Sequence, residues 1–394
     1  MIAAIMMSGI YQLLMLGSDD SRRDRLQSLV GERVTELGLK PNVIRFIVEK
    51  EAESRDPRAP LMAVFFGSPA HLANTALIDE LLEDSIVIAP LVSSVEHVHL
   101  EVPLQLRHVN VLSPASGDCI GRLATLVLET FRLLRRERKL FISYRRVDAQ
   151  PFAERLYDSL DARGFDVFID LRSVPPAVDF QSELWHRMSD ADVVVLIDTP
   201  GFRESRWTTA ELAKANATNI QILHLLWPGQ QEDALSSFSH FKRLGRSDFW
   251  GWVPGRGRWV RRNTLDLICD EAEQLRARAI AARNRYLIDN FCDAARDLGM
   301  DPTVQPEQWI SLERSGGSTL AVVPAVGVPT SNRIHEIFDA VAGLAVKPDQ
   351  IWIIYDNRGI LKTWLAHLDW LDSHLPLRTV RMANAPDLLR GLTA

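Results

Sequence analysis

Cysteine is scarce in this sequence, which has three in 394 residues: Cys119, Cys269 and Cys292. Three cysteines are too few for a disulfide framework, and these are too scattered for a zinc knuckle. We therefore expect a cytoplasmic protein, because disulfide-stabilised folds belong to oxidising compartments. Tryptophan is absent from the first part of the chain, since all ten lie after residue 184.

An excess of positive charge is also missing. The formal net charge of −6 at pH 7 gives no general electrostatic reason to bind nucleic acid or an anionic membrane. The apolar opening, MIAAIMMSGIYQLLMLGSDD, has no Lys or Arg before its apolar part and is short for a membrane span. We expect it to form a buried strand, and we expect neither nucleic acid nor a membrane as a partner.

The sequence does contain enough apolar residues for several cores. Its length predicts two or three domains, and 46% of its residues are hydrophobic. Short apolar runs alternate with helical patterns, which indicates α/β structure with parallel, helix-covered sheets. We expect three such units, at residues 1–137, 138–271 and 272–394.

In the third unit, three strands are expected, at STLAVVPA, DQIWIIYD and LRTVRMA. A Gly- and Pro-rich turn follows the first of them, and Thr330 or Ser331 begins the next helix. Such a turn can receive an anion or a nucleotide at the helix N-terminus, although ordinary helix capping is the favoured interpretation. Asp356 or Arg358, after the next strand, would face the same crevice, because ligands bind at the carboxyl ends of parallel strands.

In the second unit, the stretch SRWTTAEL places Trp207 and Glu211 four residues apart, so the two side chains share one face of a helix. Thr208 and Glu211 also form a capping-box pattern, in which the glutamate returns to the backbone at the helix start. From this pattern alone, capping is favoured over chemistry.

The second unit as a whole resembles a bacterial Toll/interleukin-1 receptor (TIR) domain. The matching features, in order, are the strand ending in FISYRR, the strand GFDVFID before a proline-bearing loop, the strand in DADVVVLIDTPGF, and the W-x-x-x-E pair. The resemblance implies a flavodoxin-like fold for this unit. The first unit, which has a similar order of elements but no such pair, is interpreted as a degenerate TIR-like copy.

Many members of this family cleave NAD at the nicotinamide–ribose bond, and bacterial members commonly act in defence against phages by depleting NAD or producing a nucleotide signal. The resemblance implies that Glu211 is catalytic. The chemistry agrees, because positive charge develops on the ribose and a facing carboxylate stabilises it. NAD is then the substrate, and no cofactor or metal is expected.

Other residues of the second unit are expected to line the substrate cleft. The candidates for substrate binding are Trp207, Ser143, Tyr144, Arg145, Arg146, Phe168 and Asp170. Structural roles stay open for several of them, since Trp207 could pack on the sheet and the two arginines could be surface charges. For Asp170 we favour a turn-forming role, and His186 and His224 are interpreted as hydrogen-bonded core histidines.

The family is usually active only when TIR domains stack, so a homo-oligomer formed through TIR–TIR contacts is expected. The outer units would then sense, assemble or restrain the central one, with an activating protein or a nucleotide as a further partner. Some family members are adaptors without catalysis. The alternative hypotheses are therefore a non-catalytic adaptor and a nucleotide-sensing scaffold.

Overall fold

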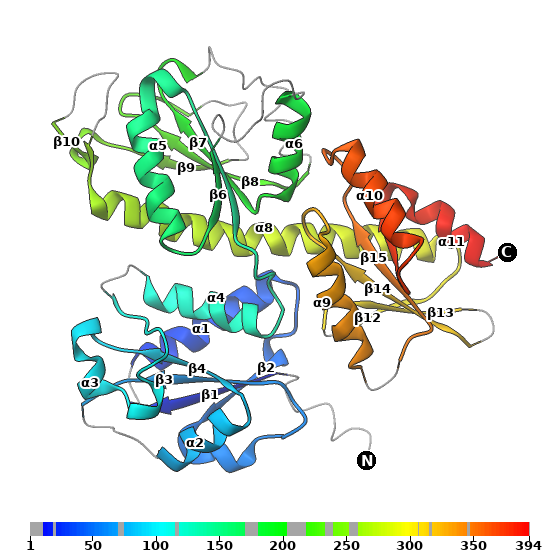
Figure 1. Ribbon diagram of the computed structural model, residues 1–394, viewed down its shortest axis with the longest axis horizontal. Coiled ribbons are helices and arrows are strands. Elements are labelled where there is room, and N and C mark those ends of the chain that lie inside the picture. The colour runs from blue at the N-terminus through cyan, green and yellow to red at the C-terminus, as the bar shows by residue number, and fades with distance from the viewer. Residues whose placement is uncertain are drawn as a thin grey trace. The chain divides into compact units, whose positions relative to one another are not determined.

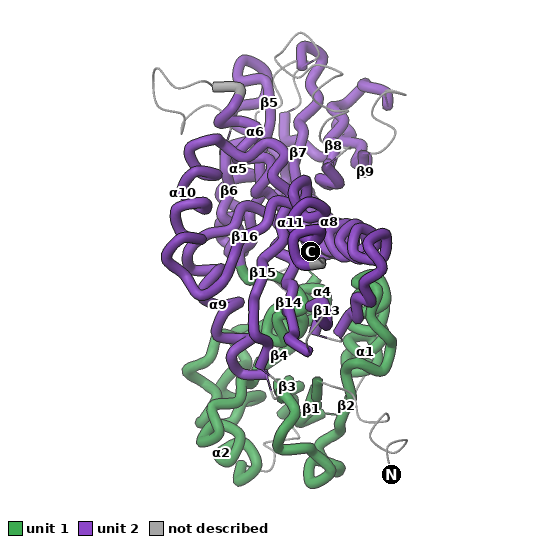
Figure 2. The backbone as a smooth tube through the Cα atoms, turned by 90° about the vertical axis from the view of Figure 1, so that its right-hand side faces the viewer, with its two compact units in different colours: residues 1–136 green, residues 137–394 purple. Residues whose placement is uncertain are grey.

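The computed structural model describes residues 11–18, 21–69, 75–114, 118–169, 180–202, 218–232, 239–251, 259–305, 307–314, 317–344 and 347–393. The chain divides into two compact units, residues 1–136 and residues 137–394, which Figure 2 distinguishes by colour. Both units consist mainly of parallel strands covered by helices (Figure 1).

Unit 1 is a parallel sheet with the strand order β2-β1-β3-β4. Its strands are β1 (Tyr11–Gly17), β2 (Ile44–Val48), β3 (Leu61–Phe66) and β4 (Val87–Leu91). Helices α1 (Ser21–Glu36) and α4 (Cys119–Thr130) pack together, and Arg33 Nη1 donates a hydrogen bond to Gly121 O at 2.9 Å. Helix α2 (Thr75–Glu83) covers the opposite face, and a short helix α3 (Val98–Glu101) follows β4 (Figure 1).

The first part of unit 2 is a five-stranded, fully parallel sheet in the order β6-β5-β7-β8-β9. The strands are β5 (Lys139–Tyr144), β6 (Asp166–Ile169), β7 (Val193–Asp198), β8 (Gln221–Leu226) and β9 (His240–Arg243). Counted along the chain, this order is 2-1-3-4-5, which is that of flavodoxin-like folds. Unit 1 has the same order over its four strands, so the two sheets share a topology.

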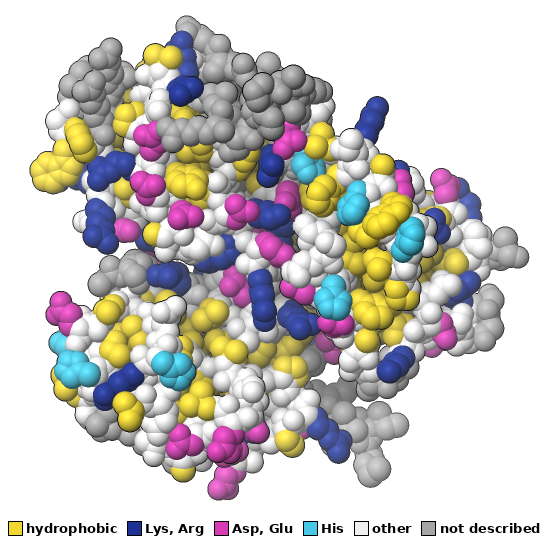
Figure 3. Space-filling model, viewed as in Figure 1, with side chains coloured by type: hydrophobic (Ala, Val, Ile, Leu, Met, Phe, Trp, Pro, Cys, Tyr) yellow, Lys and Arg dark blue, Asp and Glu magenta, His cyan; other side chains and the backbone are white. Residues whose placement is uncertain are grey.

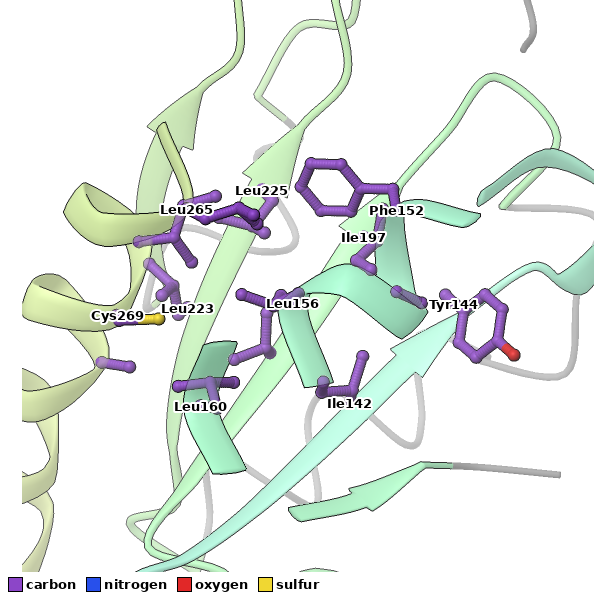
Figure 4. Close-up of a cluster of buried hydrophobic side chains, with 14 of the residues drawn as sticks. Ile142, Tyr144, Phe152, Leu156, Leu160, Ile197, Leu223, Leu225, Leu265 and Cys269 are labelled. Atoms are coloured by element: carbon purple, nitrogen blue, oxygen red, sulfur yellow. The ribbon is translucent and has the colours of Figure 1, made fainter. Parts of the chain in front are cut away.

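Helices cover both faces of this five-stranded sheet. Helix α5 (Arg146–Asp161) packs on one face together with the start of α8 (Arg262–Arg296), and their leucines meet the side chains of β5, β7 and β8 (Figure 4). Helix α6 (Phe180–Asp190) covers the other face. Because successive strand residues point to opposite faces, Ile142 joins the first layer and Phe141 the second. A two-stranded pair, β10 (Phe249–Trp250) and β11 (Trp259–Val260), precedes α8.

The second part of unit 2 is a mixed sheet in the order β12-β13-β14-β15-β16. Strands β14 (Thr319–Pro324), β15 (Gln350–Tyr355) and β16 (Arg378–Arg381) are parallel, whereas β12 (Pro302–Val304) and β13 (Ile310–Glu313) pair antiparallel at one edge. Helices α9 (Ser331–Ala342) and α10 (Lys362–Asp372) connect the parallel strands, and α11 (Ala385–Thr393) follows them. The three parallel strands confirm the sequence-based expectation, and β12 and β13 are additional.

Helix α8 belongs to both parts of unit 2. Its first half contributes Leu265, Ile268 and Leu275 to the core beneath α5, and its second half contributes Leu287 and Phe291 to the core of the mixed sheet. The boundary expected between residues 271 and 272 therefore falls inside one continuous helix. The three-unit division stays a prediction.

Candidate active site

The carboxyl ends of β5 and β7 lie side by side where the strand order changes direction. In open parallel sheets, ligands bind at this position, because the helices that follow the two strands lie on opposite faces and leave a crevice between them. The residues that the structure brings to this edge are therefore the first candidates for substrate contact.

Ser143 and Tyr144, at the end of β5, point to opposite faces of the sheet. Ser143 is 1% exposed, and its Oγ has no hydrogen-bond partner among the described residues. Tyr144 lies in the core beneath α5, with its hydroxyl directed away from the other labelled side chains (Figure 4). A buried hydroxyl without a partner is uncommon, so Ser143 is the more informative of the two.

Arg145 is held at the β5 edge by a polar cluster. Its Nη1 lies 3.3 Å from Asp148 Oδ2, and Thr199 Oγ1, just after β7, donates to the same oxygen at 3.0 Å. A Cβ on Gly201 would lie 1.6 Å from Arg145 Nη1, so the guanidinium occupies the space that a side chain at residue 201 would fill. Asp148 and Thr199 were not singled out from the sequence, although Arg145 immediately precedes α5 and Asp148 lies in the first turn of this helix.

The remaining described candidates lie on either side of this cluster. Arg146 is exposed, and its Nε lies 3.4 Å from Gln150 Oε1. Phe168, in β6, stacks on Phe141 with ring centroids 5.4 Å apart, and the guanidinium of Arg187 lies 5.2 Å from the centroid of the Phe168 ring. The part played by each in substrate binding stays a prediction.

The buried hydrogen-bond partner of His224 could not be identified from the sequence. His224 in β8 lies 3.0 Å from Asp198 Oδ2 at the end of β7, and both side chains are 5% exposed. Within the described residues, Asp198 Oδ1 and His224 Nδ1 have no further partner. The interpretation of His224 as a hydrogen-bonded core histidine is confirmed, and only the tertiary pairing of β7 with β8 reveals Asp198.

Three of the expected site residues lie outside the described residues, namely Trp207, Glu211 and Asp170. The capping-box interpretation of Thr208 and Glu211 falls outside them as well.

In the mixed sheet, the turn between β14 and α9 was a candidate for binding an anion. The structure shows ordinary helix capping there. The Thr330 side chain accepts a hydrogen bond from Arg333 N at 3.2 Å and so caps α9. Asp356 and Arg358 are paired with each other, at 2.6 Å between Oδ2 and Nη2. They also line a pocket of about 440 Å³ at the carboxyl ends of β15 and β16, together with Tyr286 and Asn290 of α8.

The described part of the chain holds no cluster of His, Cys, Asp and Glu arranged for a metal ion. Across the same residues, no helix combines the length and the apolar character that crossing a membrane requires.

Comparison with protein families matches the TIR domain over residues 140–258. A comparison with curated proteins gave no match. Among solved structures, a TIR-STING receptor from C. gigas is 13% identical, covers 64% of this chain and 94% of its own, and has a TM-score of 0.22. A putative tagatose-6-phosphate ketose/aldose isomerase from Clostridium novyi is 12% identical, with coverage of 71% and 81% and a TM-score of 0.20. TM-scores this low support no conclusion about either fold or function.

The family match spans β5 to β9, and these strands form the parallel sheet in the flavodoxin-like order that the resemblance implied. It also spans the FISYRR strand, the Arg145 cluster and the W-x-x-x-E pair. The chain is a TIR-domain protein, with the TIR domain at the start of unit 2.

Proposed function

We propose that this protein is an NAD glycohydrolase that works in the cytoplasm, in bacterial defence against phages. In the proposed reaction, the bond between nicotinamide and C1 of the ribose breaks, and the bonding electrons leave with nicotinamide. Water adds at C1 and loses a proton, which gives ADP-ribose; attack by a group of the adenine end instead gives a cyclic product. No metal or other cofactor takes part.

In this proposal, Glu211 faces the ribose and stabilises the positive charge that develops on it, because a fixed carboxylate acts most strongly where charge appears in the transition state. Arg145 and Arg146 bind the pyrophosphate through charge-assisted hydrogen bonds. Ser143 and Tyr144 contact the sugar and the nicotinamide, while Trp207, Phe168 and Asp170 line the cleft.

The observation that carries the proposal is the position of Arg145. Asp148 and Thr199 fix this arginine at the strand-order switch of a TIR sheet, which is where a dinucleotide lies in folds of this kind. The same family match includes Glu211 in its W-x-x-x-E motif.

Release of nicotinamide from NAD by the purified full-length chain tests the proposal. The wild-type chain is expected to release nicotinamide, and Glu211→Ala is expected to release at least about a hundredfold less, the cost typical of a lost charge-stabilising group. Glu336→Ala on α9 is the matched control, because it removes a glutamate from the other part of unit 2. Equal rates for Glu211→Ala and the control would refute the role of Glu211.

A non-catalytic adaptor is the alternative within the same family. It predicts no nicotinamide release at any protein concentration, including concentrations at which the chain self-associates. Such a result would refute the enzyme proposal and leave the TIR domain as a protein-binding module.

A sensing role for the mixed sheet is a second candidate, favoured by the pocket of about 440 Å³ beside Asp356 and Arg358. Its volume lies within the range of small-molecule sites. If a nucleotide binds there, AMP or ATP at saturating concentration will raise the melting temperature of the wild-type chain and not that of Arg358→Ala. An unchanged melting temperature with both nucleotides would count against nucleotide sensing.

A further inference from the structure

The carboxyl-terminal half of α6 is bound by two loops of the mixed sheet within unit 2. Val328 N, in the loop after β14, donates to Asp190 Oδ1 at 3.0 Å. In the loop after β15, Arg358 O accepts from Ser189 Oγ at 2.9 Å, and Leu361 N donates to His186 Nδ1 at 3.4 Å. We call these interactions the α6 contact.

Aromatic side chains and a glycine complete the α6 contact. The His186 ring lies 5.8 Å from the Trp364 ring of α10, and Trp364 Nε1 donates to Pro329 O at 3.0 Å. Gly359 has φ +84°, and a Cβ there would lie 2.1 Å from Ser189 Oγ. The close approach of the loop to α6 therefore depends on glycine at this position.

Helix α6 in turn packs on the candidate active site. Leu184 and Met188 are buried against Phe141 of β5, and Arg187 lies over the ring of Phe168 in β6. A shift of α6 would therefore move the side chains that stack beneath the carboxyl ends of β5 and β6, since well-packed interiors transmit displacement.

The hydrogen bonds between α6 and the two loops join side chains of α6 to loop backbone, whereas apolar cores join α8 to both sheets. Interfaces of this kind open more readily than large hydrophobic ones. Opening the α6 contact would expose the half-buried rings of His186 in α6 and Trp364 in α10, which lie 5.8 Å apart across the contact. An exposed aromatic surface favours association with another protein surface.

We propose that the α6 contact is an autoinhibitory contact: while it is closed, it covers the face of α6 through which the TIR domains of two copies of this chain associate. This proposal rests on the self-association that the proposed function requires. In the closed form, the mixed sheet holds α6 and the chain stays dissociated. Release of the loops after β14 and β15 uncovers this face of α6, and the chain self-associates.

Gly359→Ala in the full-length chain is the principal test. The new methyl group overlaps Ser189 Oγ and also strains a left-handed backbone. Gly299→Ala is the matched control, because Gly299 has φ +75° but no atom within 4 Å of the added Cβ. Ser189→Ala is a milder second variant, which removes the hydrogen bond to Arg358 O from the other side of the contact.

Hydrogen exchange of the peptide covering residues 180–190 and molar mass as a function of protein concentration are the two measurements. We expect exchange about tenfold faster in Gly359→Ala, which corresponds to about 1.4 kcal/mol, and a larger oligomeric fraction at each concentration. Ser189→Ala should lie between this variant and the wild type, and Gly299→Ala should match the wild type.

Unchanged exchange in both contact variants would refute the α6 contact as a restraint, and faster exchange without added self-association would refute its inhibitory role. Neither measurement uses NAD. If no variant releases nicotinamide, the proposed enzymatic function is refuted. Hydrogen exchange and molar mass would still test whether the α6 contact is autoinhibitory.

Discussion

Loss of one partner from the buried ion pair between Arg276 of α8 and Asp192, just before β7, should strongly destabilise unit 2. Arg276 Nε lies 3.0 Å from Asp192 Oδ2, and both side chains are 0% exposed. Arg276 Nη2 also donates to Glu137 O at 3.2 Å, and the Asp192 carboxylate accepts from Lys139 N at 3.2 Å. The pair thus ties α8 to the starts of β5 and β7.

Arg276→Met keeps most of the side-chain volume and leaves the Asp192 carboxylate buried without its cation. Breaking a buried pair in this way costs about 3–5 kcal/mol. With an m-value of about 3 kcal/mol per M, the urea midpoint should fall by about 1–2 M. The double variant Arg276→Met, Asp192→Asn should recover part of this loss, because it leaves no uncompensated charge in the interior.

Tryptophan fluorescence during urea unfolding is the suitable assay, since all ten tryptophans lie after residue 184 and the signal therefore comes from unit 2 alone. Arg296→Met is the control, because its pair with Asp293 is 58% and 71% exposed and such pairs contribute about 1 kcal/mol or less. A loss below about 1 kcal/mol for Arg276→Met, or a double variant less stable than the single one, would refute the reasoning.

Three further predictions concern the site, the thiols and pH. Gly201→Ala should displace the Arg145 guanidinium and raise KM for NAD about tenfold, the effect of roughly 1.4 kcal/mol, with an unchanged melting temperature; an unchanged KM would remove Arg145 from the site. Burial raises the pKa of Cys269 to about 12, so iodoacetamide at pH 8 should label it only after unfolding, and rapid labelling of the native chain would contradict this. Burial lowers the pKa of His186, so its stabilising contribution is complete above the unfolded value of about 6.5 and is lost as the pH falls through the lower folded value. Thermal unfolding between pH 8 and 5 should therefore narrow the gap between the wild type and His186→Gln, and parallel curves would show that His186 does not titrate this way.

Much of the fold followed from local pattern. The apolar strands and amphipathic helices of the TIR domain alternate clearly in the sequence, and the structure places them in the implied order. Strands β12 and β13 escaped notice because they are three and four residues long and pair only at the sheet edge. Strands this short carry too few alternating positions to be recognised.

Some residues of the candidate site could likewise be predicted from the sequence, and others could not. Ser143, Tyr144 and Arg145 could be placed at a strand end from sequence, because they follow an apolar run directly. Asp148 and Asp198 could not be assigned, since their partners Thr199 and His224 come from other elements. Pairings that depend on which strands become neighbours are not encoded in local periodicity.

Because α8 is one continuous helix, its length in residues determines how far the mixed sheet is rotated about the helix axis relative to the TIR strands. An α-helix turns about 100° and rises about 1.5 Å per residue, and the two cores attach to α8 on either side of Arg283. One residue inserted there would rotate the mixed sheet by about 100° around the helix axis relative to the TIR strands. Asp190 and Val328 would then separate, so the length of this helix specifies which surface of the mixed sheet α6 meets.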